Sequence, residues 1–86
     1  MREKIRTRRY VMTLHAEEEM DEDGLTIYDV ERVILTGEIV EQQRDPKSRE
    51  RKYLVRGQTV EGEKTAVVVS KFGSTGKLVF LTVYLE

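Results

Sequence analysis

The pattern of apolar and polar positions divides the chain into a helical first part and a strand-rich second part. Apolar residues recur at helical spacing over residues 14–23 and 27–36, which predicts two helices. The first carries only a thin apolar stripe, so most of its surface is expected to face solvent. The second has a broader apolar face, formed by Ile27, Val30, Val33 and Ile34.

Residues at the ends of these segments are typical helix caps. The Thr13 hydroxyl can accept an N–H of the first helical turn, and Gly24 can end that helix in the left-handed conformation. Thr26, with Asp29 three residues later, forms an Asp version of the capping box, and Gly37 ends the second helix. The sequence therefore predicts a compact pair of helices.

After Gly37 the pattern changes to strands and turns. Alternation predicts strands over 38–43 and 51–56, and apolar residues on both faces predict more central strands over 65–72 and 77–85. Residues 44–48, 57–63 and 73–76 are expected to be turns or loops. Simple alternation in the last strand places Val79, Leu81, Val83 and Leu85 on one side, and Leu78, Phe80, Thr82 and Tyr84 on the other.

These elements predict an α+β fold in which two N-terminal helices cover one face of an antiparallel sheet of about four strands. The other sheet face is expected to stay partly open. Residues 9–86 are expected to form a single domain, and residues 1–8 a flexible basic tail. Residues 8–12 fit either a short strand or an extended lead-in.

Composition limits the classes of function. The 86-residue chain has no cysteine, which excludes disulfides and thiolate metal sites. No apolar run is long enough for a membrane span, and a cytoplasmic location is expected. The net charge is only −1, but basic residues gather in 1–10 and 44–56, and eight acids with no Lys or Arg occupy 13–31. This segregation predicts a basic face and an acidic face.

His15 is the only histidine and the only side chain whose ordinary pKa lies near neutrality. It is a candidate general acid or base, although a structural histidine bonded to backbone at a helix start is an equally good interpretation. Together with Glu18 and Glu19 it forms only a weak set of metal ligands. No metal site and no cofactor are therefore predicted.

Other candidate residues lie on the strands. Arg51, Lys52, Tyr53 and Arg56 form a basic run with an aromatic side chain, a combination that suits RNA, although a solvated hairpin is the commoner explanation. The acidic first helix would repel phosphates unless it lies on another face. Thr82 and Tyr84 share one side of the last strand, and Lys71 ends the strand before it; buried or solvated structural roles are the alternatives.

In combination, the residues resemble a small prokaryotic family of unknown function. The resemblance covers about residues 10–85. The matching positions are Thr13, His15, Ala16, Met20, Gly24–Thr26, Asp29, Val30, Gly37–Ile39, Lys52–Val55 and Leu81–Tyr84. The family often carries arginines where this chain has Glu19 and Asp23, so any phosphate contacts made by those arginines are missing here.

That family is similar to the RelE and MqsR ribonuclease toxins, which place two helices on an antiparallel sheet. The resemblance implies metal-independent cleavage of RNA, often on the ribosome, with an antitoxin partner. It points to His15, Thr82 and Tyr84 as catalytic residues, with Lys71 as a further proton donor and the basic strand near the phosphate. A non-catalytic module that binds protein or RNA on the same fold is the alternative.

Overall fold

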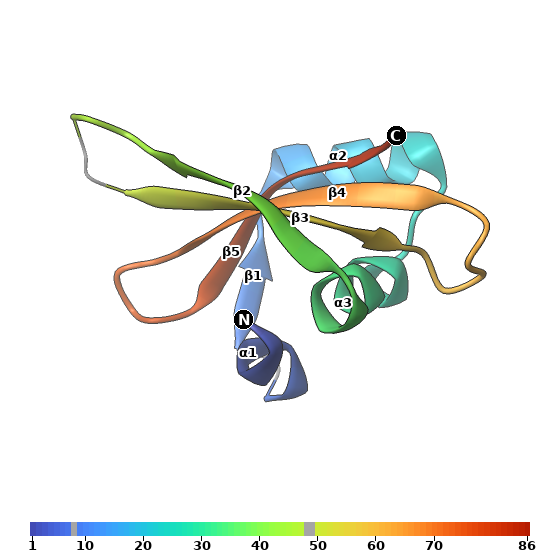
Figure 1. Cartoon of the computed structure of the whole chain (residues 1–86), viewed down its shortest axis with the longest axis horizontal. Coiled ribbons are helices and arrows are strands. Elements are labelled where there is room, and N and C mark those ends of the chain that lie inside the picture. Colours follow the sequence, from blue (N-terminus) through green and yellow to red (C-terminus); the bar gives the residue numbers. More distant parts are fainter. Residues whose placement is uncertain (8, 48–49) are drawn as a thin grey trace.

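The computed structural model describes residues 1–7, 9–47 and 50–86 (Figure 1). Three helices, α1 (Arg2–Arg6), α2 (Leu14–Asp23) and α3 (Ile27–Thr36), accompany five strands. The strands are β1 (Tyr10–Met12), β2 (Glu38–Arg44), β3 (Arg51–Gln58), β4 (Thr65–Phe72) and β5 (Leu78–Leu85). None of the described helices combines the length and apolar character needed to cross a bilayer.

The two predicted helices begin and end where the caps indicated. Thr13 Oγ1 accepts the N–H of Ala16 at 3.1 Å, and Gly24 closes α2 with a φ of 68°. Thr26 and Asp29 form the predicted capping box, in which each side chain accepts the other residue's N–H. Gly37 also ends α3, but its φ of −82° is open to any residue. Space is the reason for glycine here, because a Cβ would lie 2.4 Å from the carbonyl oxygens of Val33 and Arg56.

The sheet differs from the prediction in number and direction of strands. It has five strands in the order β1-β5-β4-β3-β2 and is mixed, because β1 runs parallel to β5 and the other pairs are antiparallel. The sequence predicted about four antiparallel strands. Three residues of β1 carry too little pattern to reveal a strand, and a parallel partner 68 positions away leaves no local signal.

A short helix lies within residues 1–8, the segment predicted as a flexible basic tail. Residues 2–6 form α1, and Ile5 is buried in the core with 3% of its surface exposed. Ile5 in the core, Met1 packed against it and the Arg2 hydrogen bond to the Gly37 carbonyl hold this short helix against the rest of the chain. Arg8, the last residue of the predicted tail, lies outside the described residues, as do Ser48 and Arg49 of the predicted turn and basic run.

The core lies between the helices and one face of the sheet. Val55, Val68 and Val83 face one another across three neighbouring strands and are each at most 2% exposed. Helices α2 and α3 cover them with Ala16, Met20, Val30, Val33 and Ile34, which are all buried. The apolar face predicted for residues 27–36 is therefore confirmed. The β2–β3 hairpin extends away from the helices (Figure 1).

A β-bulge corrects the predicted faces of the last strand. Ser70 pairs with Phe80 and Val69 pairs with Thr82, so Leu81 is an extra residue without a partner in β4. The bulge puts Leu78, Phe80 and Val83 together in the core, where simple alternation had separated them. Thr82 and Tyr84 consequently project from the opposite, open face.

Candidate functional site

His15 lies in the first turn of α2 and is held by a carboxylate on the same helix. Its Nε2 atom lies 3.2 Å from Oε1 of Glu19, one helical turn later, and 67% of the His15 side chain is exposed. The same Glu19 oxygen accepts the backbone N–H of Val83 at 3.2 Å. The imidazole is thus open to solvent while its partner is anchored to the sheet.

The anchor lies on a free stretch of strand edge. β1 pairs with β5 only at residues 78–80, so the N–H of Val83 lies beyond the end of β1 and would otherwise lack a strand partner. Thr13 makes a second link, since its hydroxyl donates to the carbonyl of Leu81 at 3.2 Å. These two bonds fix the His15 end of α2 against residues 81–83 of β5.

The hydroxyls predicted to act with His15 lie on the open face of the sheet. Thr82 stands in a row with Val69 and Leu54, and Tyr84 in the next row with Val67 and Arg56. Thr82 is partly buried, and Tyr84 is 37% exposed. Thr82 is next to Val83 in the chain and therefore lies close to the Glu19 anchor, whereas Tyr84 is further along the strand.

Lys71 is on the same open face but away from Tyr84. It pairs with Val79, whereas Tyr84 pairs with Val67, so four positions of β4, or about 13 Å, separate the two rows. The Lys71 ammonium forms an ion pair with Glu50 at 3.2 Å. Among the described residues, no hydrogen bond or ion pair joins His15 to Thr82, Tyr84 or Lys71. The four predicted catalytic residues are therefore not assembled into one contact network.

The four predicted RNA-binding residues are divided between the two sheet faces. Arg51 and Tyr53 alternate with Lys52 and Arg56 along β3, and only Lys52 and Arg56 are on the face of Tyr84. Tyr53 stacks edge-on against Phe72, with ring centroids 6.1 Å apart. This division follows from the alternation of the strand, in which adjacent residues point in opposite directions, and RNA binding by the four residues stays a prediction.

Arg56 already has an anionic partner. Its Nε and Nη2 atoms lie 2.8 and 2.7 Å from Oε2 of Glu86, so the pair bridges β4 on the open face. The hydrogen bond to Glu86 and the charge of that carboxylate raise the pKa of Arg56 above its ordinary value. Arg56 therefore keeps its proton, and much of its charge is balanced before any phosphate approaches.

The part of Glu19 was missed by the sequence analysis. Its spacing from His15 was visible, since residues four apart on a helix are neighbours. The bond to Val83 was not visible, because it depends on where β1 stops and on the bulge at Leu81. Within residues 1–7, 9–47 and 50–86, no three His, Asp or Glu side chains are grouped as metal ligands.

Comparison with known proteins gives one match. The sequence model of a domain of unknown function (DUF4258) matches residues 12–85. No curated protein and no solved structure matches the chain.

Proposed function

We propose that this chain, which belongs to the DUF4258 family, is a metal-independent endoribonuclease similar to the RelE and MqsR toxins. One observation carries the proposal: the exposed imidazole of His15 is paired with Glu19, which is itself bonded to the backbone of Val83. A carboxylate that orients an accessible histidine is a common arrangement for a general acid or base. The resemblance of the sequence to this toxin class supplies the substrate.

The reaction that fits these residues is attack by a ribose 2′-hydroxyl on the adjacent phosphorus. His15 takes the proton of the 2′-hydroxyl, the new P–O2′ bond forms, and the bond to the 5′-oxygen breaks. The 5′-oxygen takes up a proton, and the other product ends in a 2′,3′-cyclic phosphate. Glu19 stabilises the imidazolium that forms, and Thr82, next to Val83 in the chain, would orient the phosphate.

Tyr84 and Lys71 remain the candidates for the second proton transfer within this proposal. Both belong to the open face, so RNA would have to run from the edge of β5 across that face to reach them. Lys52 shares this face and would contribute a cation, together with Arg56 once the latter exchanges Glu86 for phosphate. Arg51 and Tyr53 lie on the opposite face, so they would contact RNA only if the RNA wraps around the β2–β3 hairpin.

A cleavage assay with purified protein tests the proposal. The proposed acid–base chemistry needs no metal, so RNA cleavage should continue in EDTA and leave 2′,3′-cyclic or 3′-phosphate ends. His15→Ala should lower the rate by a factor on the order of 10²–10⁴ with the fold intact. Glu18→Gln, an exposed change on the same helix, is the matched control and should keep the wild-type rate.

Substrate context and partners follow from the same proposal. If cleavage requires translating ribosomes, as for many toxins of this class, the assay must include them, and the site of action would be cytoplasmic. Expression of the wild type should slow growth, His15→Ala should not, and an antitoxin protein would relieve the effect. Wild-type protein that neither cuts RNA with ribosomes present nor slows growth contradicts the nuclease proposal.

A non-catalytic module that binds protein or RNA is the second candidate, and a specific observation favours it. Two cations on the open face already have partners, Arg56 with Glu86 and Lys71 with Glu50. In addition, this chain has Glu19 and Asp23 at two positions where the resemblance implies arginines. Binding without cleavage in the assay above, unaffected by His15→Ala, would support this candidate.

A further inference from the structure

The outer edge of β2 has the features of a strand-addition site. β2 ends the sheet order, so within the described residues its outer backbone groups have no strand beside them. All seven residues of β2 are exposed, and the large apolar side chains of Ile39 and Val40 keep 48% and 49% of their surface in solvent. β2 contains neither lysine nor proline, two residues that often protect such edges. The protection that it does carry is a β-bulge at Val40 and the charges of Glu38, Glu41 and Arg44.

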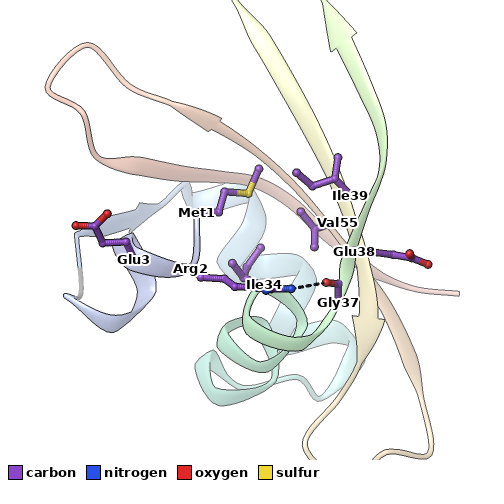
Figure 2. Close-up of a pocket in the computed structure, with 8 residues that line it drawn as sticks. All are labelled: Met1, Arg2, Glu3, Ile34, Gly37, Glu38, Ile39 and Val55. Carbon is purple, nitrogen blue, oxygen red and sulfur yellow. Dashed lines mark hydrogen bonds between the residues drawn. The ribbon is translucent and has the colours of Figure 1, made fainter.

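An apolar groove lies directly beside this edge on the helix side. It has a volume of about 550 Å³, and Met1, Ile34, Ile39 and Val55 supply its apolar lining (Figure 2). Ile34 and Val55 are buried, whereas Ile39 belongs to β2 itself. Arg2 crosses one side and donates to the carbonyl of Gly37 at 3.4 Å. A strand paired with β2 would therefore find a place for an apolar side chain next to Ile39.

Charge along β2 is polarised. Its beginning carries Glu38 and Glu41, and the hairpin from residue 44 to 52 carries five Lys or Arg against two acids. An antiparallel strand on β2 would begin beside the basic hairpin and finish beside the two glutamates. Complementarity then requires acidic residues at the start of the added strand and basic residues at its end.

We propose that β2 binds an extended segment of another protein, which pairs antiparallel with it as a sixth strand. The segment has an acidic N-terminal end, a basic C-terminal end and an apolar side chain that enters the groove beside Ile39. Backbone hydrogen bonds supply the affinity and the groove supplies selectivity, as in other cases of strand addition. The proposal stands apart from the nuclease activity and does not need His15.

A second copy of the chain fits this edge less well. In the antiparallel self-pairing that aligns Glu38 with Arg44 of the other copy, Glu41 faces its own counterpart. The same register sets Ile39 and Val40 opposite two glutamines, Gln43 and Gln42. Like charges and an apolar–polar mismatch at the centre of the pairing disfavour the homodimer.

The test titrates ¹⁵N-labelled protein with three synthetic peptides of alternating Val and Thr. The first begins with Asp-Glu and ends with Lys-Lys, the second has these ends exchanged, and the third repeats the first with the backbone nitrogen of every Val and Thr methylated, so that neither edge of the peptide keeps its donors. The first peptide should shift the amide signals of residues 38–44 saturably. Exchanged ends should weaken binding about two- to fivefold, and methylation should abolish it because the backbone donors are lost.

Variants of the protein locate the binding surface. Ile39→Ala should weaken binding of the first peptide roughly fivefold or more through lost apolar contact. Arg44→Glu should reduce the difference in affinity between the first two peptides, because it lowers the net positive charge of the hairpin. Glu18→Gln on α2 is the matched control and should leave binding unchanged. Peptides that leave residues 38–44 unshifted, or a methylated peptide that binds as well as the first, would overturn the proposal. A concentration-dependent dimer that Ile39→Ala dissociates would assign the edge to a second copy instead.

Discussion

Val83 donates its backbone N–H to the Glu19 carboxylate although 64 positions separate the two residues in the chain. The bond closes a free stretch of the β5 edge with a helical side chain instead of another strand. Because the same carboxylate oxygen meets the His15 imidazole, stability and the candidate acid–base group depend on one residue.

Replacement of Glu19 should therefore weaken the fold. We expect Glu19→Ala to lower the free energy of unfolding by about 1–3 kcal/mol, because a partly buried N–H loses a charged acceptor. Urea melts measure the change, with the exposed Glu18→Ala as control. Glu19→Gln, which retains an acceptor oxygen, should lose less. Equal stability of Glu19→Ala and wild type would show that the Val83 N–H has another acceptor in solution.

Val33 joins α3 to the sheet and is fully buried. Val33→Ala should lower the free energy of unfolding by roughly 1–3 kcal/mol through lost apolar burial and a small cavity. The exposed Tyr28→Ala, on the same helix, should change it much less. A loss below half a kilocalorie for Val33→Ala in denaturant melts, well under that range, would remove α3 from the core.

Asp29 makes part of the stability depend on pH. Burial alone would raise its pKa, but hydrogen bonds from the Thr26 and Val60 backbone and from the Thr26 hydroxyl, with the charge of Lys64, lower it below its ordinary value. Because its pKa is lower in the folded state, Asp29 stabilises the fold at pH values above its unfolded pKa of about 3.9. This stabilisation is lost as the pH falls through the folded pKa.

The stabilising effect of wild-type Asp29 over Asp29→Asn should therefore be constant above about pH 5 and shrink below about pH 4. Urea melts from pH 2.5 to 7 measure it, and Asp21→Asn, an exposed change, controls for the lost charge. A difference that grows toward acid pH would contradict the lowered pKa.

RNA binding, if it occurs on the open face, should weaken steeply with salt because phosphate contacts release counterions. Lys52→Gln should reduce the slope of log affinity against log salt by about 1. Arg56→Gln should reduce it less, since Glu86 already balances Arg56. Filter binding compares the variants between about 50 and 200 mM salt, a range over which affinity that depends on phosphate contacts falls strongly. Affinity independent of salt would indicate an apolar interface.

The sequence predicted local features of the fold well. Thr13, Gly24, Thr26 and Asp29 act as caps because capping depends on neighbours within four residues. The helix α1 was missed, and β1 was left open between a short strand and an extended lead-in, since each element is short and is stabilised by distant contacts. The faces of β5 were misassigned because one extra residue, Leu81, reverses the alternation, and nothing in the composition of the strand announces a bulge.

The candidate site was predicted in part. The sequence showed His15 and its spacing from Glu19, and the exposed position of His15 is compatible with a role as general acid or base. The grouping of His15 with Tyr84 and Lys71 depended on three segments meeting, which no local pattern reports. The basic run of β3 is a simpler case, because the alternation of the strand alone puts Tyr53 on the face opposite to Lys52 and Arg56.

The position of β5 has a consequence for how the chain folds as it is made. β5 is the last of the five described strands along the chain, yet it lies between β1 and β4 in the sheet. During synthesis about 66 further residues must be added after β1 before its partner strand begins. Such long-range pairing slows folding compared with helical chains of similar length. Until β5 has been made, β1 and β4 therefore lack the strand that joins them in the finished sheet.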